Sequence, residues 1–400
     1  PFLLGSRRGL RARRPAAERP AQPGAAPGGA VGAMEPRSWN PHIYTEVIRG
    51  YTAHSLREID RVRRNLMGLS EDDKNELVWK PEEQVAKMKG AVLSNMTFLN
   101  KISGMIDKAA PLDNPDHPHG VKPIQVLLQT VMREWSAEGE EERRDCFERL
   151  LGAVDSHLKA EAEQAAANGA PKPKVLCPGA NLGRLPFEAQ RRGYECSGCE
   201  SRVLHYFVCE FLKQNGGKDA TTIQPFVLNT CNRFKREDHV RPTPFPELEI
   251  TAGSFPSIRY GDFTRLYDDA AERAQYDALV TSFAVDTSPS IFRFVRTAAH
   301  VVREGGIWAN FGPLAYDTEH DEAHGRGLEL SWEELRYAVS QFFEVKEEAF
   351  VDALSASNGR SMMQIQYSCI FFSAVRNGKP ALGIGCGSPS GPSAPATGSS

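Results

Sequence analysis

The sequence predicts an α/β domain with a mostly parallel, doubly wound sheet, preceded by a helical region. Three observations support this fold class. Near Ala170 the hydrophobic period changes from helical spacing to short apolar runs that alternate with helical stretches. A glycine-bearing turn, PGANLGRL, follows the first of these runs. Two further apolar runs, FEVKEEAFV and QIQYSCIFFSAV, come last and predict two closing strands.

The composition is that of an ordinary globular protein. Of the 400 residues, 40% are hydrophobic and 25% are charged, and the formal net charge is −3. Because this charge gives no strong field, we expect no nucleic-acid partner. No apolar run approaches the roughly 20 residues needed to span a bilayer, so we expect no membrane partner. We expect a cytoplasmic location, with the nucleus as a second compartment.

The eight cysteines are scattered, and only Cys196 and Cys199 form a CxxC pair. A structural zinc ion takes about four ligands, and no second CxxC or nearby HxxxH supplies the others. We therefore expect reduced cysteines in the core and no metal, with a zinc site as the weaker alternative.

The composition divides the chain into four parts: 1–40, 41–169, 170–378 and 379–400. The first is rich in Arg, Ala, Pro and Gly, and the last is rich in Gly, Ser and Pro, so we expect both to be disordered. An Arg-rich, acid-poor leader is also compatible with a transit peptide.

Residues 41–169 show helical periodicity through YTEVIRGYTAHSLREIDRVRRNLMGL and PEEQVAKMKGAVLSNMTFLNKISGMID. Ser70 and Asp73 predict a helix cap between these two stretches. The segment APLDNPDHPHG predicts a loop, and IQVLLQTVMREW and RDCFERLLGAVDSHLKAEAEQAAA predict two more helices. These amphipathic helices offer a surface for a homodimer.

Residues 170–378 alternate strand and helix patterns, which is typical of βαβ units. The predicted strands are VLCPGA, YECSGCE, DALVTSFAV and GIWANFG, followed by the two closing strands. The predicted helices are GRLPFEAQRRG, VLHYFVCEFLK, SIFRFVRTAAHVVREGG and SWEELRYAVSQF.

The turn PGANLGRL lies where a nucleotide-binding fold places glycines, between its first strand and first helix. Gly179 and Gly183 allow the backbone to approach a ligand and the helix to pack tightly. Asn181 replaces the usual middle glycine and is one of the few other residues that tolerate positive φ.

Two acidic residues follow later strands and suit an adenosine ligand. Glu200 lies about 20 residues after the turn, where a carboxylate can accept hydrogen bonds from both ribose hydroxyls. The alternative is a solvated glutamate at a helix start. Asp262 and Phe263 stand where the third strand of such a sheet should end, and there a carboxylate can bind the adenine amine and a ring can pack on its face. The alternative is a common turn with a hydrophobic anchor.

These elements fit either NAD or S-adenosylmethionine as the ligand. A helix followed by two more strands favours the S-adenosylmethionine-dependent class I sheet of seven strands, whose last strand inserts antiparallel. No second catalytic domain typical of a dehydrogenase follows. An NAD-dependent oxidoreductase is therefore the weaker alternative.

The order of landmarks resembles the carnosine N-methyltransferase family over roughly residues 41–376. These landmarks are REWS, PGANLGRL, GDF, VDT, GGIWANFGPLAY and SMMQIQYSC. The resemblance implies an S-adenosylmethionine-dependent enzyme that methylates an imidazole nitrogen of carnosine, giving anserine.

Family positions carry over residue by residue as what the resemblance implies. The cofactor residues are Arg133, Gly179, Glu200, Asp262, Phe263 and Ser282. Arg133 matches the arginine that holds the cofactor, and a guanidinium can grip the methionine carboxylate with two hydrogen bonds. The alternative for Arg133 is an ion pair with one of the glutamates at 138–142. Ser282 stands where the family has a cysteine.

Asp286 matches the substrate-binding aspartate, which we expect to be catalytic. A carboxylate that accepts one imidazole N–H fixes the tautomer and stabilises the imidazolium that forms when the other nitrogen attacks. The alternative is a helix N-cap. The resemblance also implies that Asp317 and Tyr367 contact the substrate.

Two departures leave the substrate open. Asp317 replaces a family histidine, and Ile365 replaces a second pocket tyrosine. We expect a small histidine-containing dipeptide as substrate. The alternatives are a methyltransferase of another small amine or of a protein histidine, and a catalytically idle cofactor-binding module.

Overall fold

A computed structural model describes residues 38–216, 221–288, 290–316 and 328–381. Asp317 lies outside the described residues. So do the two ends that we predict to be disordered, apart from residues 38–40 and 379–381. The described residues all belong to one compact unit. Within the described ranges, no helix is both long and apolar enough to cross a bilayer.

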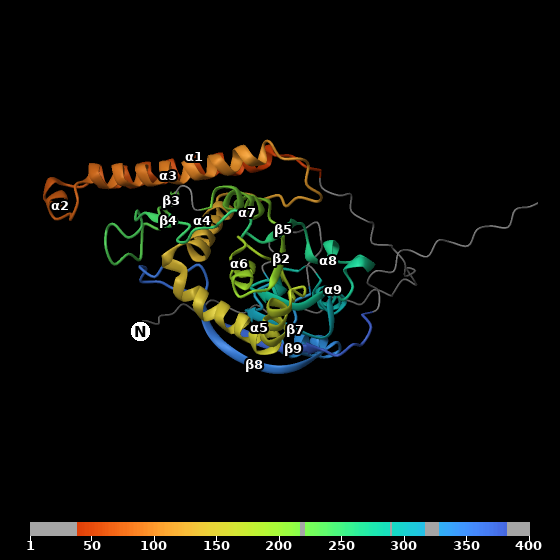
Figure 1. The fold of residues 1–400 in the computed structure, drawn as a ribbon. Helices are drawn as coiled ribbons and strands as arrows, with labels where there is room; N and C mark the ends of the chain where they lie inside the picture. Colours follow the sequence, from red (N-terminus) through yellow and green to blue (C-terminus); the bar gives the residue numbers. More distant parts are fainter. Residues whose placement is uncertain (1–37, 217–220, 289, 317–327, 382–400) are drawn as a thin grey trace, which may run out of the picture. The chain divides into compact units, whose positions relative to one another are not determined.

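The N-terminal part is helical, as its periodicity predicts. α1 and α3 run side by side (Figure 1), and their buried apolar residues recur at helical spacing. The hydroxyl of Ser70 accepts the Asp73 amide and thereby caps α2. The elements are α1 (His42–Met67), α2 (Glu71–Asn75), α3 (Pro81–Ile106), α4 (Lys122–Trp135), the 3-10 turn η1 (Ala137–Gly139) and α5 (Glu140–Asn168).

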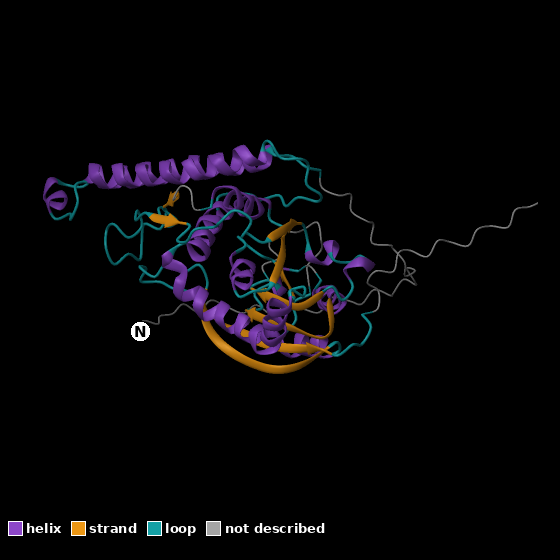
Figure 2. Cartoon of the chain, viewed as in Figure 1, coloured by secondary structure: helices purple, strands orange, loops and turns teal. Residues whose placement is uncertain are grey.

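The rest of the chain builds a seven-stranded sheet in the order β5-β2-β1-β6-β7-β9-β8. Its first five strands are parallel, and β9 inserts between β7 and β8, antiparallel to both. Figure 2 shows these strands, with the long, curved β8 at one edge. The strands are β1 (Lys174–Pro178), β2 (Glu195–Glu200), β5 (Ser257–Tyr260), β6 (Tyr276–Ser282), β7 (Val302–Gly312), β8 (Phe343–Leu354) and β9 (Gln366–Arg376).

Helices cover both faces of the sheet, so its central strands are buried on both sides. Val175 and Cys177 of β1 face the core that includes α5 and α6, whereas Leu176 faces the core that includes α9 and α10. The remaining elements are α6 (Arg184–Arg191), α7 (Val203–Asn215), α8 (Phe263–Leu266), η2 (Ala270–Glu272), η3 (Val285–Thr287), α9 (Ile291–Val301), α10 (Trp332–Ser340) and a small hairpin of β3 (Thr221–Ile223) and β4 (Thr243–Phe245).

One predicted helix was too long. The helical pattern of SIFRFVRTAAHVVREGG predicts one helix to Gly306, but α9 ends at Val301 and the chain continues directly as β7. Val302 pairs with Tyr276 of β6, and Gly305 takes a φ of +76°. Strand pairing and two glycines therefore override the helical spacing.

The CxxC pair lies in β2, and its two side chains join different cores. Cys196 packs with α5 and α6, while Cys199 packs with α8 and α9. Residues three apart in a strand point to opposite faces, so these thiols do not bind one ion together.

The helical part and the sheet share a hydrophobic core. Phe98 of α3 packs edge-on against Phe211 of α7, with ring centroids 5.6 Å apart. Val131 of α4 belongs to the same cluster as Leu182, which follows β1. The boundary at 169/170 stays a prediction, and the helical region is positioned to contribute to a site at the sheet.

Candidate active site

The candidate site lies at the carboxyl edge of the parallel strands. Pairing places Pro178 beside Cys199 and Glu200 beside Tyr260, so the loops after β1, β2 and β5 emerge at the same edge. The strand order reverses between β1 and β6. In open α/β sheets, ligands bind outside the carboxyl ends of the strands at such a switch point.

The turn after β1 has the backbone that its residue types predict. Gly179, Asn181 and Gly183 all adopt positive φ, at +62°, +51° and +79°. A Cβ on Gly179 would lie 2.9 Å from the Ala284 Cβ, and one on Gly183 would lie 2.7 Å from the Phe255 ring. Both glycines are therefore required by conformation and by space.

Glu200 ends β2 and is buried, so the alternative of a solvated helix-start glutamate is wrong. Its Oε2 accepts the Asn181 amide at 2.9 Å, which ties the acid to the glycine turn. Its Oε1 accepts the backbone N–H and the Nε of Arg202, both at 2.9 Å. Arg202 Nη2 lies 3.3 Å from Oε2.

Arg133 lies in the last turn of α4 and is buried, with its guanidinium 5.1 Å from the Phe283 ring centroid. Its Nε lies 3.4 Å from Glu142 Oε2, so the ion pair expected as the alternative is present. Even so, neither Nε nor Nη2 makes a hydrogen bond of good geometry with any residue in the described part of the chain. These two donors suit a bidentate carboxylate, which is what the methionine end of S-adenosylmethionine offers.

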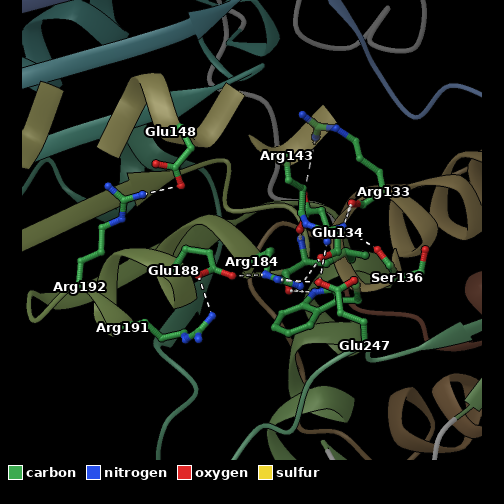
Figure 3. A network of polar contacts seen from close by, with 12 residues as sticks. Arg133, Glu134, Ser136, Arg143, Glu148, Arg184, Glu188, Arg191, Arg192 and Glu247 are labelled. Carbon is green, nitrogen blue, oxygen red and sulfur yellow. Dashed lines mark hydrogen bonds and ion pairs between the residues drawn. The ribbon is translucent and has the colours of Figure 1, made fainter. Parts of the chain in front are cut away.

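The last turn of α4 is clamped by cations (Figure 3). Arg143 donates to the carbonyls of Arg133 and Ser136 at 2.6 and 2.8 Å. Arg184 donates to the Glu134 carbonyl at 2.8 Å, and Glu247 accepts from both arginines. Carbonyls at a helix end have no partner within the helix, so these arginines satisfy them and complement the helix dipole.

Glu134 links the same helix end to the glycine turn. Its Oε2 accepts the Leu182 amide at 3.0 Å, and Trp135 donates its indole N–H to the Leu182 carbonyl at 3.0 Å. Burial raises the pKa of Glu134 to about 7, although Arg133 lowers it in part. The clamp therefore contains an acid that titrates near neutral pH.

The predicted adenine residues follow β5. Asp262 precedes α8 and accepts the Thr264 hydroxyl at 2.6 Å. Phe263 is buried, with its ring 4.8 Å from that of Phe294, as the hydrophobic-anchor alternative expects. Ser282 ends β6, where its Oγ lies 3.3 Å from the Cys146 Sγ. Their contacts with a cofactor stay predictions.

Of the predicted substrate residues, Asp286 is buried in η3, just beyond the carboxyl end of β6. Its Oδ2 accepts the Ala315 amide at 2.8 Å, which holds it against the segment after β7. The N-cap alternative is wrong, because Ser290 occupies the N-cap position of α9. Tyr367 on β9 packs edge-on against Phe283, with ring centroids 6.2 Å apart.

The structure thus brings the predicted residues to one edge of the sheet, except Asp317, which lies outside the described residues. Ile365 is 64% exposed just before β9. Sequence reasoning missed Glu134, Phe283 and the clamping arginines. Glu134 follows Arg133 in the run REWS, so the sequence could have indicated it. No local pattern indicates the clamping arginines or Glu247.

An antiparallel last strand inserted beside five parallel ones, with a glycine turn after the first, defines a class I methyltransferase that uses S-adenosylmethionine. This strand order argues against the NAD-dependent alternative. Residues 114–378 match the family model described as carnosine N-methyltransferase. The chain belongs to the carnosine N-methyltransferase family.

Two curated relatives give the extent of the likeness. The chain is 29% identical over 339 residues to the carnosine N-methyltransferase of Dictyostelium discoideum, covering 77% of this chain and 70% of that protein. It is 30% identical over 256 residues to that of Rattus norvegicus, covering 62% of each. The match thus spans less than two thirds of the rat protein.

A solved structure of an S-adenosylmethionine-dependent methyltransferase from Methanosarcina mazei is 11% identical, with a TM-score of 0.34, over 53% of this chain and 96% of that one. At this TM-score the match carries no argument, and the fold class rests on the strand order.

Proposed function

We propose that this chain transfers a methyl group from S-adenosylmethionine to an imidazole nitrogen of carnosine, giving anserine, or of a related histidine-containing dipeptide. The single observation that carries the proposal is the position of Asp286. Its carboxylate is buried at the switch point, two residues beyond Ala284, which faces the Gly179 turn. A buried anion there suits a substrate that becomes a cation during the reaction.

The cofactor would be held along the carboxyl edge of the sheet. Arg133 offers Nε and Nη2 to the methionine carboxylate, and Gly179 lets the backbone approach. Glu200 would accept from the ribose hydroxyls. Asp262 and Phe263 would lie at the adenine end and Ser282 near the middle.

S-adenosylmethionine supplies an electrophilic methyl carbon when it is bound. Imidazole attacks only through a nitrogen that carries no proton, so the enzyme must select one tautomer. Asp286 would accept the N–H of the other nitrogen, orient the ring and stabilise the imidazolium product. Tyr367 would pack against the dipeptide, and Asp317 would contact its polar end.

The exposed position of Ile365 favours a second candidate substrate. Where the resemblance implies a pocket tyrosine, this chain presents an aliphatic side chain that is 64% exposed. A more open pocket would admit another small amine or a histidine within a protein.

Titration calorimetry with S-adenosylmethionine and S-adenosylhomocysteine, followed by mass detection of methylated products from a panel, tests the proposal. The panel contains carnosine, free histidine, another small amine and a histidine-containing peptide. A mass gain on the carnosine imidazole is the expected result. Methylation of the peptide or the amine alone favours the second candidate substrate. If S-adenosylmethionine binds and no product forms, the chain is a catalytically idle cofactor-binding module.

The predicted homodimer would use the N-terminal helices. Leu56 of α1 and Leu93 of α3 are 50% and 62% exposed. Sedimentation of the full chain and of a Leu56→Glu, Leu93→Glu variant tests this proposal, since a dimer through these helices would dissociate in the variant.

A further inference from the structure

Glu142, in the first turn of α5, contacts both the cofactor arginine and the loop between β8 and β9. Its Oε2 lies 3.4 Å from Arg133 Nε and accepts the Ala356 amide at 2.8 Å. Its Oε1 accepts the Ser357 amide at 2.8 Å. The Glu142 side chain is 11% exposed, so little water competes for these contacts.

The loop backbone needs this carboxylate. Ala356 adopts a φ of +50°, which an alanine rarely takes because its Cβ crowds the backbone. Two successive N–H groups turned toward one anion form a recognised anion-binding arrangement. Glu142 thus holds the loop in a conformation that its own residues do not favour.

The same loop leads directly to the proposed substrate side. It joins β8 to β9, and Tyr367 is the second residue of β9. The Tyr367 ring packs on Phe283, and the Phe283 ring lies against the Arg133 guanidinium. Contacts therefore connect Arg133, Glu142, the loop, Tyr367 and Phe283, from the proposed cofactor arginine to the proposed substrate tyrosine.

We propose that Glu142 is a positioning residue that couples cofactor binding to the order of the β8–β9 loop, so that the bound cofactor tightens the substrate side. This inference rests on the proposed function. A carboxylate from the cofactor would take the Nε and Nη2 donors of Arg133. Glu142 would then lose its ion pair with Arg133 and would bind only the two loop amides.

Hydrogen exchange of the full chain, with and without S-adenosylhomocysteine, tests the coupling without turnover. In the wild type we expect this ligand to slow exchange in the peptide that covers 354–366. In Glu142→Gln the slowing should disappear, because the amide of glutamine has one acceptor oxygen and its NH2 group repels the second loop N–H. The matched control is Glu141→Gln, a neighbour whose side chain is 84% exposed.

Kinetics add a second readout. Coupling between two ligands is reciprocal, so Glu142→Gln should raise the KM for carnosine by about 10-fold and leave kcat within about 3-fold. Adding Ala356→Gly to Glu142→Gln should lower the raised KM part of the way back to the wild-type value, because glycine adopts positive φ without the carboxylate. A residue that only stabilised the fold would not be rescued in this way.

The outcomes separate the two proposals. If S-adenosylhomocysteine binds but leaves loop exchange unchanged in the wild type, the coupling is overturned and the proposed function stands. If the loop responds in the wild type and not in Glu142→Gln, the coupling is supported, whichever imidazole the enzyme methylates. If S-adenosylhomocysteine does not bind at all, both are overturned.

Discussion

The proposed cofactor side and the proposed substrate side of the site are held in different ways. On the cofactor side, the last turn of α4 has its carbonyls bonded by Arg143 and Arg184, and Glu134 ties it to the glycine turn. On the substrate side, Tyr367 is half-buried and Ile365 is exposed. A cofactor that is the same for every substrate is bound best by a preorganised site. A substrate pocket whose side chains have few fixed contacts can change its specificity when single residues are replaced.

The sharpest test of this comparison removes the charge of Asp286 and nothing else. We expect Asp286→Asn to lose about 10²–10⁴-fold in turnover, because a neutral amide neither stabilises the imidazolium nor selects the tautomer. The asparagine oxygen still accepts the Ala315 amide, so the fold and cofactor binding should persist. Kinetics and calorimetry with S-adenosylhomocysteine measure the two effects.

The control for this variant is Asp352→Asn on the exposed part of β8. Turnover that is unchanged in Asp286→Asn would remove the proposed role of this carboxylate. Parallel losses of turnover and of cofactor affinity would show that the two sides are not separable.

The second test compares two glycines with the same backbone and different surroundings. Gly179 and Gly120 have φ of +62° and +70°, but a Cβ meets Ala284 at Gly179 and nothing within 4 Å at Gly120. Gly120→Ala should lower the free energy of unfolding by about 1 kcal/mol through strain alone. Gly179→Ala should lower it by about 2–4 kcal/mol and weaken S-adenosylhomocysteine binding at least about 10-fold, because overpacking adds to the strain. Equal effects would mean that the turn is not tightly packed.

Local sequence patterns predicted those parts of the fold and the site whose conformation depends on neighbouring residues in the chain. The turn needs positive φ at three positions, and two glycines and an asparagine are the residues that accept it. Most strands of the sheet followed from apolar runs, and the two closing strands correctly predicted a last strand that inserts antiparallel. The end of α9 could not be read in this way, since it depends on the pairing of Val302 with Tyr276 in another strand.

The clamp on α4 could not be predicted, because its partners are distant in sequence. Glu247 lies more than a hundred residues after Arg143, and several charged residues nearer in the chain were equally plausible partners. Gly139 shows the same limit, since a Cβ there would overlap the Arg133 carbonyl group. The run REWSAEG contains this glycine, but only the packing shows why no side chain fits.

The third test sharpens the cofactor side through Glu134. Its pKa is raised by burial from 4.5 to about 7, so between these values the native state binds more protons than the unfolded state. The free energy of unfolding therefore falls as pH rises from about 4.5 to about 7 and stays lowered above that range. Glu134→Gln keeps an oxygen for the Leu182 amide and removes the titration.

We expect Glu134→Gln to be more stable than the wild type at pH 8, by up to about 3 kcal/mol, and to match it near pH 4. Thermal melting at several pH values measures the difference, with the exposed Glu141→Gln as control. A variant that is less stable at every pH would show that the ion pair with Arg133 outweighs the cost of burying the charge.

The smallest expected effect concerns a second place where the proposed cofactor side must rearrange for its ligand, besides the Arg133–Glu142 ion pair. Glu200 accepts four N–H contacts, three of them from Arg202, and a carboxylate has about four acceptor positions. Ribose hydroxyls can bind Glu200 only when the Arg202 side chain, which is 42% exposed, moves into water. The pair joins a buried carboxylate to a partly exposed guanidinium, and displacing this guanidinium costs binding free energy. Arg202→Met removes that cost and should tighten S-adenosylhomocysteine binding by about 2–5-fold. Calorimetry measures this change, and Arg191→Met, which alters an exposed arginine of α6, should leave the affinity unchanged. Weaker binding in Arg202→Met would mean that the arginine orients Glu200 for the ribose, and the cofactor side would then be preorganised throughout.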